Sequence, residues 1–284
     1  YAQDIDGATV QDDASLAFGT DYGTFKICIS ECGLSTKYAF DNSAYGVGSD
    51  TGYGGGAASG TTMQYGSNIS SYNNIQYHAP ADLLPLGMTF KAGMTPGGAG
   101  GSANASVHSV NGDVNGEMTQ YAVTMAPVDG LTLSASYYDF GDMGKDDARQ
   151  AAEGGSYSAN YSMGSFSVGY GETLHAAAQQ KGVFTTKDAA AVQHYENDAY
   201  SIGFAVNDSL SVSYTEENSV KKNKATSATN TVTRSDVEME ITTIDLSYTV
   251  GGATLGISNS EMSNDSYTAG DDTTETIVAL SLAF

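Results

Sequence analysis

The sequence predicts an all-β fold, a transmembrane barrel of antiparallel strands that forms a single domain over residues 1–284. Two observations carry this prediction. About thirteen segments alternate apolar and polar side chains with the period of two that is typical of a strand with one apolar face. The connections between these segments alternate strictly between short and long, as the turns and loops of an outer-membrane barrel do.

The last segment of the chain shows the alternation most clearly. Val278, Leu280, Leu282 and Phe284 share one face of residues 276–284, and smaller residues occupy the positions between them. Twelve upstream segments repeat the pattern, and their apolar rows include, in reverse order, Leu255, Ile244, Leu210, Tyr200, Phe166, Tyr157, Leu131, Tyr121, Phe90, Ile75, Phe25 and Leu16. Several tyrosines stand at the ends of these rows, where an aromatic girdle would meet the membrane surface: Tyr121, Tyr137, Tyr170, Tyr200 and Tyr214.

The connections favour a membrane barrel over a soluble β-sandwich or propeller, since neither of those requires every other connection to be long. The polar face of the segments also carries few large apolar side chains, so it is not suited to a packed core. The short connections, rich in Gly, Asn, Asp and Pro, are 20–23, 80–87, 127–130, 164–165, 207–209 and 251–252. The long ones are 30–74, 95–116, 139–155, 172–197, 216–239 and 260–274.

Composition narrows the class of partner. The chain has 11 Lys and Arg against 33 Asp and Glu, a formal net charge of −22, which argues against nucleic-acid binding. The same charge favours divalent cations or cationic solutes. No stretch reaches the roughly 20 consecutive apolar residues that a membrane helix requires.

Four features resemble the general porins of Gram-negative outer membranes, in particular the alphaproteobacterial branch. They are the hairpin 13–26, the long 30–74 connection directly after it, the segment 74–80, and the terminal strand ending in Phe284. The resemblance implies a barrel of about 16 strands, a homotrimer, and a third loop, here 30–74, folded inward to constrict the pore. It also implies that Leu280, Leu282 and Phe284 form the outer-membrane assembly signal.

Counting back from Phe284 on this pattern makes residues 1–11 the second loop. About three strands would then precede Tyr1, because an open sheet edge is not satisfied in lipid. The alternative for residues 30–74 is a flexible surface loop.

Parity along the strands places four titratable side chains in the lumen: Lys26, His78, Lys91 and Asp245. A lysine on the lipid face near the midplane would cost roughly 2–4 kcal/mol, which supports this placement. If the 30–74 loop folds inward, three acidic side chains join the constriction: Glu31, Asp41 and Asp50. The resemblance implies a transverse field between basic wall residues and acidic loop residues.

Cysteines and acidic loops leave two questions open. Cys28 and Cys32 form either a local disulfide or two free thiols. Loop carboxylates either hold structural Ca²⁺ or Mg²⁺, with Asp4, Asp6, Asp271 and Asp272 as candidates, or form a solvated acidic surface. The pair Asp4 and Asp6 lacks the full spacing of a calcium loop. No other cofactor is expected.

The expected function is passive diffusion of small hydrophilic solutes and ions through a cation-preferring porin of the bacterial outer membrane. Its partners would be those solutes, outer-membrane lipid or lipopolysaccharide, and two further copies of the chain. A substrate-specific channel and a surface adhesin or phage receptor remain alternatives. An enzyme is not expected, since none of the four histidines, His78, His108, His175 and His194, lies in a nucleophile motif.

Overall fold

The fold is that of a computed structural model. It describes residues 2–6, 10–28, 32–34, 63, 66, 69, 74–95, 117–141, 149–150, 152–176, 179–180, 192–223 and 236–282. Residues 2–6, 10–14, 149–150 and 179–180 are described by their backbone alone. Within these ranges, no helix is long and apolar enough to cross a membrane.

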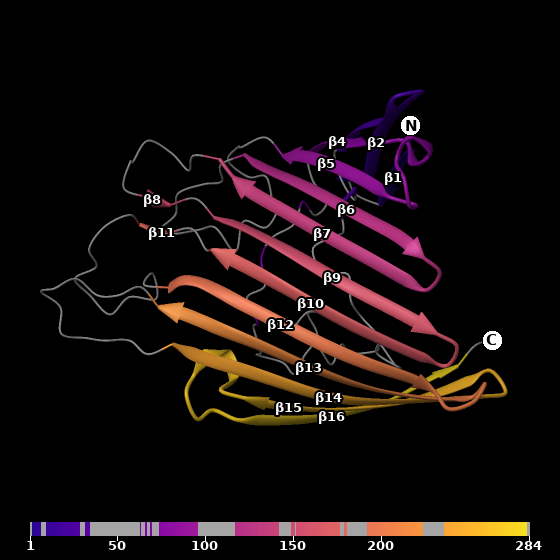
Figure 1. The fold of residues 1–284 in the computed structure, drawn as a ribbon, viewed down its shortest axis with the longest axis vertical. Coiled ribbons are helices and arrows are strands. Elements are labelled where there is room, and N and C mark those ends of the chain that lie inside the picture. Colours follow the sequence, from indigo (N-terminus) through magenta and orange to yellow (C-terminus); the bar gives the residue numbers. More distant parts are fainter. Residues whose placement is uncertain are drawn as a thin grey trace, which may run out of the picture.

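Fourteen strands form one antiparallel sheet, and each pairs with the next long strand along the chain (Figure 1). The thirteen strands predicted from the sequence are all present, which confirms the fold class. The strands of the sheet are β1 (Ala2–Asp6), β2 (Val10–Thr20), β3 (Gly23–Cys28), β4 (Asn74–His78), β5 (Thr89–Thr95), β6 (Met118–Val128), β7 (Leu131–Phe140), β9 (Glu153–Met163), β10 (Phe166–Ala176), β12 (Val192–Ala205), β13 (Leu210–Asn223), β14 (Val237–Val250), β15 (Ala253–Ser263) and β16 (Thr273–Leu282). A separate pair joins β8 (Arg149–Gln150) to β11 (Gln179–Gln180), and two short 3₁₀ helices are η1 (Ala81–Leu83) and η3 (Asp265–Tyr267).

One prediction at the start of the chain is wrong. Within the predicted loop of residues 1–11, the described residues 2–6 and 10–11 are strand, because β1 pairs with β2 in a register that runs from Ala2↔Ser15 to Asp6↔Val10. Backbone hydrogen bonds hold such a hairpin together whatever the polarity of its side chains. A polar hairpin therefore escapes a search for apolar alternation.

Strands in the second half of the chain also extend beyond their predicted ends. The strands β12, β13 and β14 each have 14 residues, and they continue into segments expected to be loops. About 9–11 residues suffice to cross a bilayer, so these strands are long enough to extend past the membrane.

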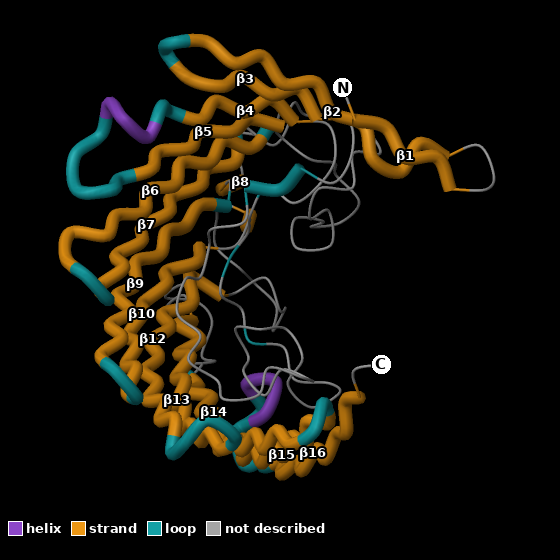
Figure 2. Tube along the Cα trace, turned by 90° about the vertical axis from the view of Figure 1, so that its right-hand side faces the viewer, coloured by secondary structure: helices purple, strands orange, loops and turns teal. Residues whose placement is uncertain are grey.

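The sheet curves into an open C in which β1 and β16 are the two edge strands (Figure 2). The helix η3 lies on the concave side, where Tyr267 packs against Met239 and Ile241 of β14. Side chains of the same parity as Ile241 therefore form the inner face, and those between them form the outer face.

The two faces differ in chemistry. On the inner face, Asp245 lies opposite Ser213 and Ser258, and all three are buried. On the outer face, the neighbouring Ile244 is 56% exposed. The same outer parity holds for many other exposed apolar side chains, among them Phe18, Phe25, Ile27, Ile75, Val168, Ile202, Leu255, Val278 and Leu280.

Short turns gather at one end of the strands, as the alternation of connections predicts (Figure 1). The turn between β6 and β7 contains Gly130, whose φ is +79°. A Cβ atom at this position would lie 2.2 Å from the carbonyl oxygen of Ser162. Glycine therefore serves here both for its left-handed backbone and for its lack of a side chain.

Candidate pore-lining site

A basic group of side chains lies on the inner face of strands β3 to β5. Lys26 is opposite Gln76, and His78 is opposite Lys91, so that parity puts all of them on one face. Lys26, His78 and Lys91 are each partly exposed. We call these three residues the basic group. In the described part of the chain, none of the three forms an ion pair.

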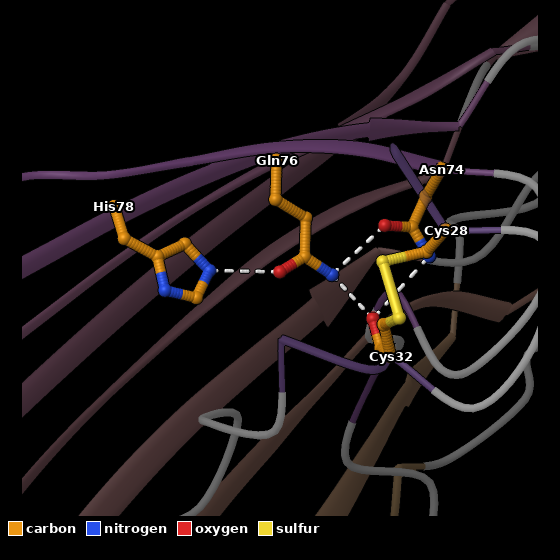
Figure 3. The surroundings of a disulfide bond; sticks show 5 residues. All are labelled: Cys28, Cys32, Asn74, Gln76 and His78. Carbon is orange, nitrogen blue, oxygen red and sulfur yellow. Dashed lines mark hydrogen bonds between the residues drawn. A yellow bond between two sulfur atoms is a disulfide. The ribbon is translucent and has the colours of Figure 1, made fainter. Parts of the chain in front are cut away.

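Gln76 connects the basic group to the chain segment that follows β3 (Figure 3). Its Nε2 donates to the carbonyl oxygen of Cys32 and, at 2.8 Å, to Oδ1 of Asn74. Its Oε1 lies 2.8 Å from Nε2 of His78. An amide oxygen only accepts, so the histidine donates from Nε2 and the ring is fixed in orientation.

Cys28 and Cys32 form a disulfide, with their Cα atoms 5.8 Å apart (Figure 3). Nδ2 of Asn74 also donates to the carbonyl oxygen of Cys32, at 3.3 Å. The disulfide thus attaches residue 32 to the end of β3, while two side-chain amides attach it to β4. The base of the 30–74 segment is held on the inner face.

Further described residues of this segment lie against the inner face. The backbone N–H of Leu34 donates to the carbonyl oxygen of Ile69 at 2.9 Å. The N–H of Ile69 donates to Oε1 of Gln120 on β6 at 2.8 Å. Leu34 and Ile69 are fully buried, in a cluster that includes Met118 and Tyr138. That the whole 30–74 loop narrows a pore stays a prediction.

The inner face of strands β12 to β15 is covered more completely. Met63 packs there with Met239, Ile241 and Tyr267 in a second apolar cluster. Asp245 is 1% exposed, and its Oδ2 accepts a hydrogen bond from the Ser213 hydroxyl at 3.2 Å. Strands β3–β5 and β13–β16 form opposite arms of the C (Figure 2), so the basic group and Asp245 belong to different arms.

The remaining predicted residues divide into two sets. Leu280 and Leu282 lie on the outer face of β16, 64% and 50% exposed. Residues outside the described part of the chain are Glu31, Asp41, Asp50 and Phe284, while Asp4 and Asp6 belong to the backbone-only strand β1. Their roles stay predictions.

Asp271 and Asp272 lie in the turn between η3 and β16. Oδ1 of Asp272 accepts the backbone N–H of Asn264 at 3.1 Å, and the carbonyl oxygen of Asp271 accepts that of Asp265 at 2.6 Å. Both residues therefore stabilise the turn. Within the described ranges, no three His, Cys, Asp or Glu side chains are grouped as a metal site would require. Binding of Ca²⁺ or Mg²⁺ stays a prediction.

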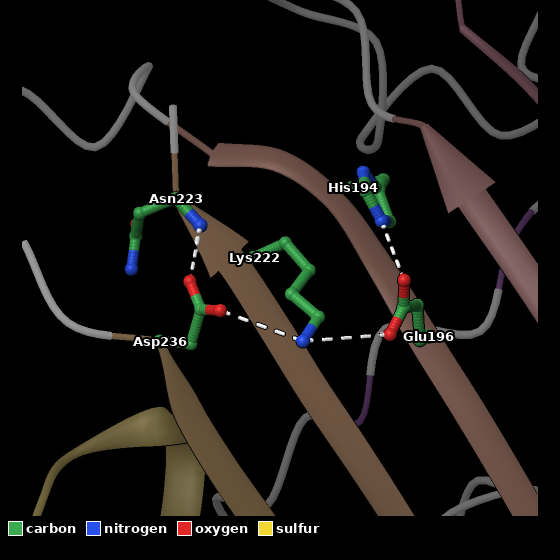
Figure 4. A network of polar contacts seen from close by, with 5 residues as sticks. All are labelled: His194, Glu196, Lys222, Asn223 and Asp236. Atoms are coloured by element: carbon green, nitrogen blue, oxygen red, sulfur yellow. Dashed lines mark hydrogen bonds and ion pairs between the residues drawn. The ribbon is translucent and has the colours of Figure 1, made fainter. Parts of the chain in front are cut away.

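An ionic network joins β12, β13 and the start of β14 at the ends of these strands away from the short turns (Figure 4). Nζ of Lys222 lies 3.5 Å from Glu196 and 3.4 Å from Asp236, while Nε2 of His194 lies 2.9 Å from Glu196. The backbone N–H of Asn223 donates to Asp236 at 3.0 Å. That N–H, followed by the Lys222 charge, lowers the pKa of the Asp236 carboxyl.

The five tyrosines of the predicted girdle all lie on the outer face. Tyr121 is opposite Tyr137, and Tyr170 is opposite Tyr200. Hydroxyls of Tyr200 and Tyr214 donate to Glu216 between them. A pocket of about 950 Å³ is lined in part by Tyr137 and Tyr170.

Sequence reasoning missed Gln76 and Gln120, which hold the 30–74 segment to the wall. Alternation along the strands does place both on the inner face, but many other residues of that face are also polar. Long-range contacts alone distinguish these two amides from other polar residues, and no sequence signal reports such contacts.

An antiparallel sheet with an apolar exposed outer face, a polar inner face and tight turns at one end is the wall of an outer-membrane-type β-barrel. Solved structures share this fold. A loop L8 deletion mutant of OmpT, an outer membrane protein of Vibrio cholerae, matches 95% of this chain and 79% of its own at 13% identity, with a TM-score of 0.52.

Two further solved structures share the fold. A refined porin structure matches 94% of this chain and 80% of its own at 11% identity, with a TM-score of 0.56. The Salmonella typhi OmpF complex with daunomycin matches 91% and 74% at 16% identity, also with a TM-score of 0.56. At these identities the likeness shows the fold. No protein-family model and no curated protein sequence matches the chain.

Proposed function

We propose that the chain forms the wall of a bacterial outer-membrane channel through which small hydrophilic solutes and ions diffuse passively. The observation that carries this proposal is the division of the sheet into an exposed apolar outer face and a polar inner face. Lipid accommodates the first and water the second. The shared fold with a porin and with OmpF supports the same function.

The basic group favours a channel over a barrel that only displays surface loops. A receptor or adhesin works through its loops and has no need of charged side chains inside its wall. Lys26, His78 and Lys91 face inward and keep partial exposure, as residues in contact with permeating solutes would. Recognition of phage or of host surfaces by the acidic loops is compatible with such a channel.

Three finer features belong to the proposal. A net charge of −22 attracts cations to the mouth and favours cation preference. A homotrimer in contact with outer-membrane lipid agrees with the closed symmetry of most oligomers. We propose no enzymatic activity for the channel: among the described histidines, His78 and His194 contact Gln76 and Glu196, and His175 contacts the hydroxyl of Tyr138.

Single-channel conductance of the full-length protein in a planar bilayer tests the proposal. A large, ohmic, cation-preferring conductance is expected. Saturable block by one neutral solute would replace passive diffusion with a substrate-specific channel. A folded protein that inserts and passes no current would overturn the channel and favour the receptor.

A further inference from the structure

The described residues of the 30–74 segment meet the inner face in two places. Leu34 and Ile69 are buried in the cluster on β6 and β7, whereas Met63 is 5% exposed in the cluster on β12, β14 and β15. Strands β6 and β7 lie in a different part of the C from β14 and β15 (Figure 2). Met63 therefore has a contact with the wall that is separate from the contact made by Leu34 and Ile69.

The site that holds Met63 includes a residue from another long connection. Tyr267 of η3, in the predicted loop 260–274, is 7% exposed and belongs to the same apolar cluster as Met63. Its φ is +58° and that of Ser266 is +53°. Bulky residues rarely adopt this left-handed conformation, which persists where the surrounding structure holds it. The contacts of the Tyr267 side chain supply such a restraint.

The hydroxyl group of Tyr267 is fixed by a directed series of hydrogen bonds on the inner face. It lies 2.6 Å from Oγ of Ser219 on β13. The Ser219 hydroxyl donates its one hydrogen to Oδ1 of Asn197 on β12, so Tyr267 is the donor in the first contact. Nδ2 of Asn197 donates in turn to Oγ1 of Thr173 on β10, at 2.7 Å. Tyr267 is thus connected through its hydroxyl to three strands of the wall.

The ring of Tyr267 has partners on two of the same strands. Its centroid lies 5.2 Å from that of the Tyr195 ring on β12, and Nζ of Lys221 on β13 lies 5.2 Å from the Tyr267 centroid. Tyr195 and Lys221 are opposite each other in the register of these strands. A cation over an aromatic ring is attracted by the charge distribution of the ring. Both the ring and the hydroxyl of Tyr267 are therefore held to the wall, while its apolar cluster includes Met63.

We infer that Tyr267 is a positioning residue that holds Met63, and with it the 30–74 segment, against β12, β14 and β15. The inference rests on the proposed channel, in which the 30–74 segment borders the pore, and adds a residue that determines where this segment lies. It also makes the position of the first long connection of the chain depend on the last. Loss of the Tyr267 side chain should leave residue 63 exposed more often.

Thiol labelling at residue 63 tests the inference without any measurement of current. Met63→Cys is made in the full-length protein, folded in phospholipid vesicles, where Cys28 and Cys32 stay in their disulfide and do not react. A water-soluble maleimide then reports how often residue 63 leaves its buried site. Labelling of Met63→Cys should be slow. Adding Tyr267→Ala should accelerate it at least about tenfold, which corresponds to a loss of about 1.4 kcal/mol of packing.

Further variants, each made in the Met63→Cys protein, show whether the effect is specific. Tyr267→Phe keeps the ring and should accelerate labelling less than Tyr267→Ala. Tyr267→Leu keeps an apolar side chain but loses the ring and hydroxyl contacts. It should also accelerate labelling, and it replaces Tyr267→Ala if that variant does not fold. Phe140→Ala is the matched control, because it removes an aromatic ring that is 4% exposed from the other cluster, and it should leave labelling at residue 63 unchanged.

Single-channel records give a second readout, which a merely structural role would not change. With methionine retained at position 63, Tyr267→Ala should increase the open-channel current noise, because the released segment moves beside the permeating ions. Tyr267→Phe should increase this noise less.

The outcomes separate the two proposals. Labelling that Tyr267→Ala leaves unchanged, or that Phe140→Ala accelerates equally, overturns the inference and leaves the channel standing. Unchanged current noise in Tyr267→Ala overturns the positioning of a pore segment even where labelling is fast. A wild type that passes no current overturns the channel, while labelling still decides whether Tyr267 holds Met63.

Discussion

Leu34 packs against the backbone of Gly93. A Cβ atom on Gly93 would lie 2.5 Å from Cδ1 of Leu34 and 3.0 Å from Cδ1 of Ile69. The absence of a side chain on Gly93 is therefore what allows Leu34 and Ile69 to lie close to β5. Gly93→Ala should lower the free energy of unfolding by about 1–3 kcal/mol through overpacking. Urea titration followed by circular dichroism measures this change.

Gly19 provides the control for that substitution. It lies on β2 with nothing within 4 Å of its ideal Cβ position, and its φ is not positive. Gly19→Ala should leave the unfolding free energy unchanged or raise it slightly, since alanine has less backbone freedom to lose. Equal losses in both variants would contradict the close contact between Leu34 and Gly93.

The placement of Ile202 tests whether the outer face meets lipid. This side chain is 48% exposed on β12, three residues before the strand ends at Ala205. Ile202→Lys would be harmless on a water-facing surface, but on a lipid-facing one it should lower the free energy of unfolding, by up to roughly 2–4 kcal/mol if the position lies near the bilayer midplane. Urea unfolding from phospholipid vesicles measures the loss.

Ser167→Lys is the matched change on the inner face, where Ser167 is partly exposed opposite Gly203. It should cost far less than Ile202→Lys, because the new ammonium group reaches water. If the two lysines have similar effects in vesicles, the assignment of the faces is wrong.

The disulfide closes a short loop, because its two cysteines are separated by only four positions in sequence numbering. Replacing both by serine should lower the free energy of unfolding by about 2 kcal/mol, the chain-entropy value for a loop of this size. Reductant should have the same effect on the wild type and none on the Cys28→Ser/Cys32→Ser variant. Identical urea midpoints for wild type and variant would show that the disulfide adds no stability.

The carboxyl group of Asp236 makes the free energy of unfolding depend on pH in the acid range. Its pKa is lowered in the folded chain by the N–H of Asn223 and by Lys222. A lowered carboxyl pKa gives stability that is present above the unfolded value, about 4, and is lost as pH falls through the folded value. The difference in urea midpoint between wild type and Asp236→Asn should therefore shrink as pH is lowered through this range.

A second variant tests the ion pair directly. Lys222→Gln should raise the Asp236 pKa toward its ordinary value, as a carboxyl NMR titration would show. An unchanged pKa would contradict the ion pair.

The sheet was predictable because lipid imposes one chemistry on every second residue. The row Val278, Leu280 and Leu282 identifies a strand without any knowledge of its partners, and the inward parity of Lys26 and Asp245 follows from the same rule. The strand β1 and its pairing with the start of β2 were not predictable, because these residues follow no apolar alternation and the pairing is made by backbone hydrogen bonds.

Contacts between distant segments could not be predicted from the sequence either. Ile69 and Gln120 are 51 residues apart, and their hydrogen bond depends on how the chain enters the concave side. The lone glycine at position 93 is equally uninformative by itself, since its role emerges only when Leu34 is placed over it. Residues of the strands alternate with a period of two that the sequence shows, while residues that pack on the concave side of the sheet follow no such pattern.

The strict pairing of each strand with its neighbours in sequence has a consequence for how such a wall can change over time. A hairpin such as β9–β10 touches only the strand before it and the strand after it within the sheet. Gene duplication or deletion of one hairpin would leave every other pairing intact while altering the circumference, and barrel diameter grows with strand number. The hairpin is thus the unit that can be gained or lost without disturbing the rest of this fold, and the width of such a barrel can change in steps of one hairpin.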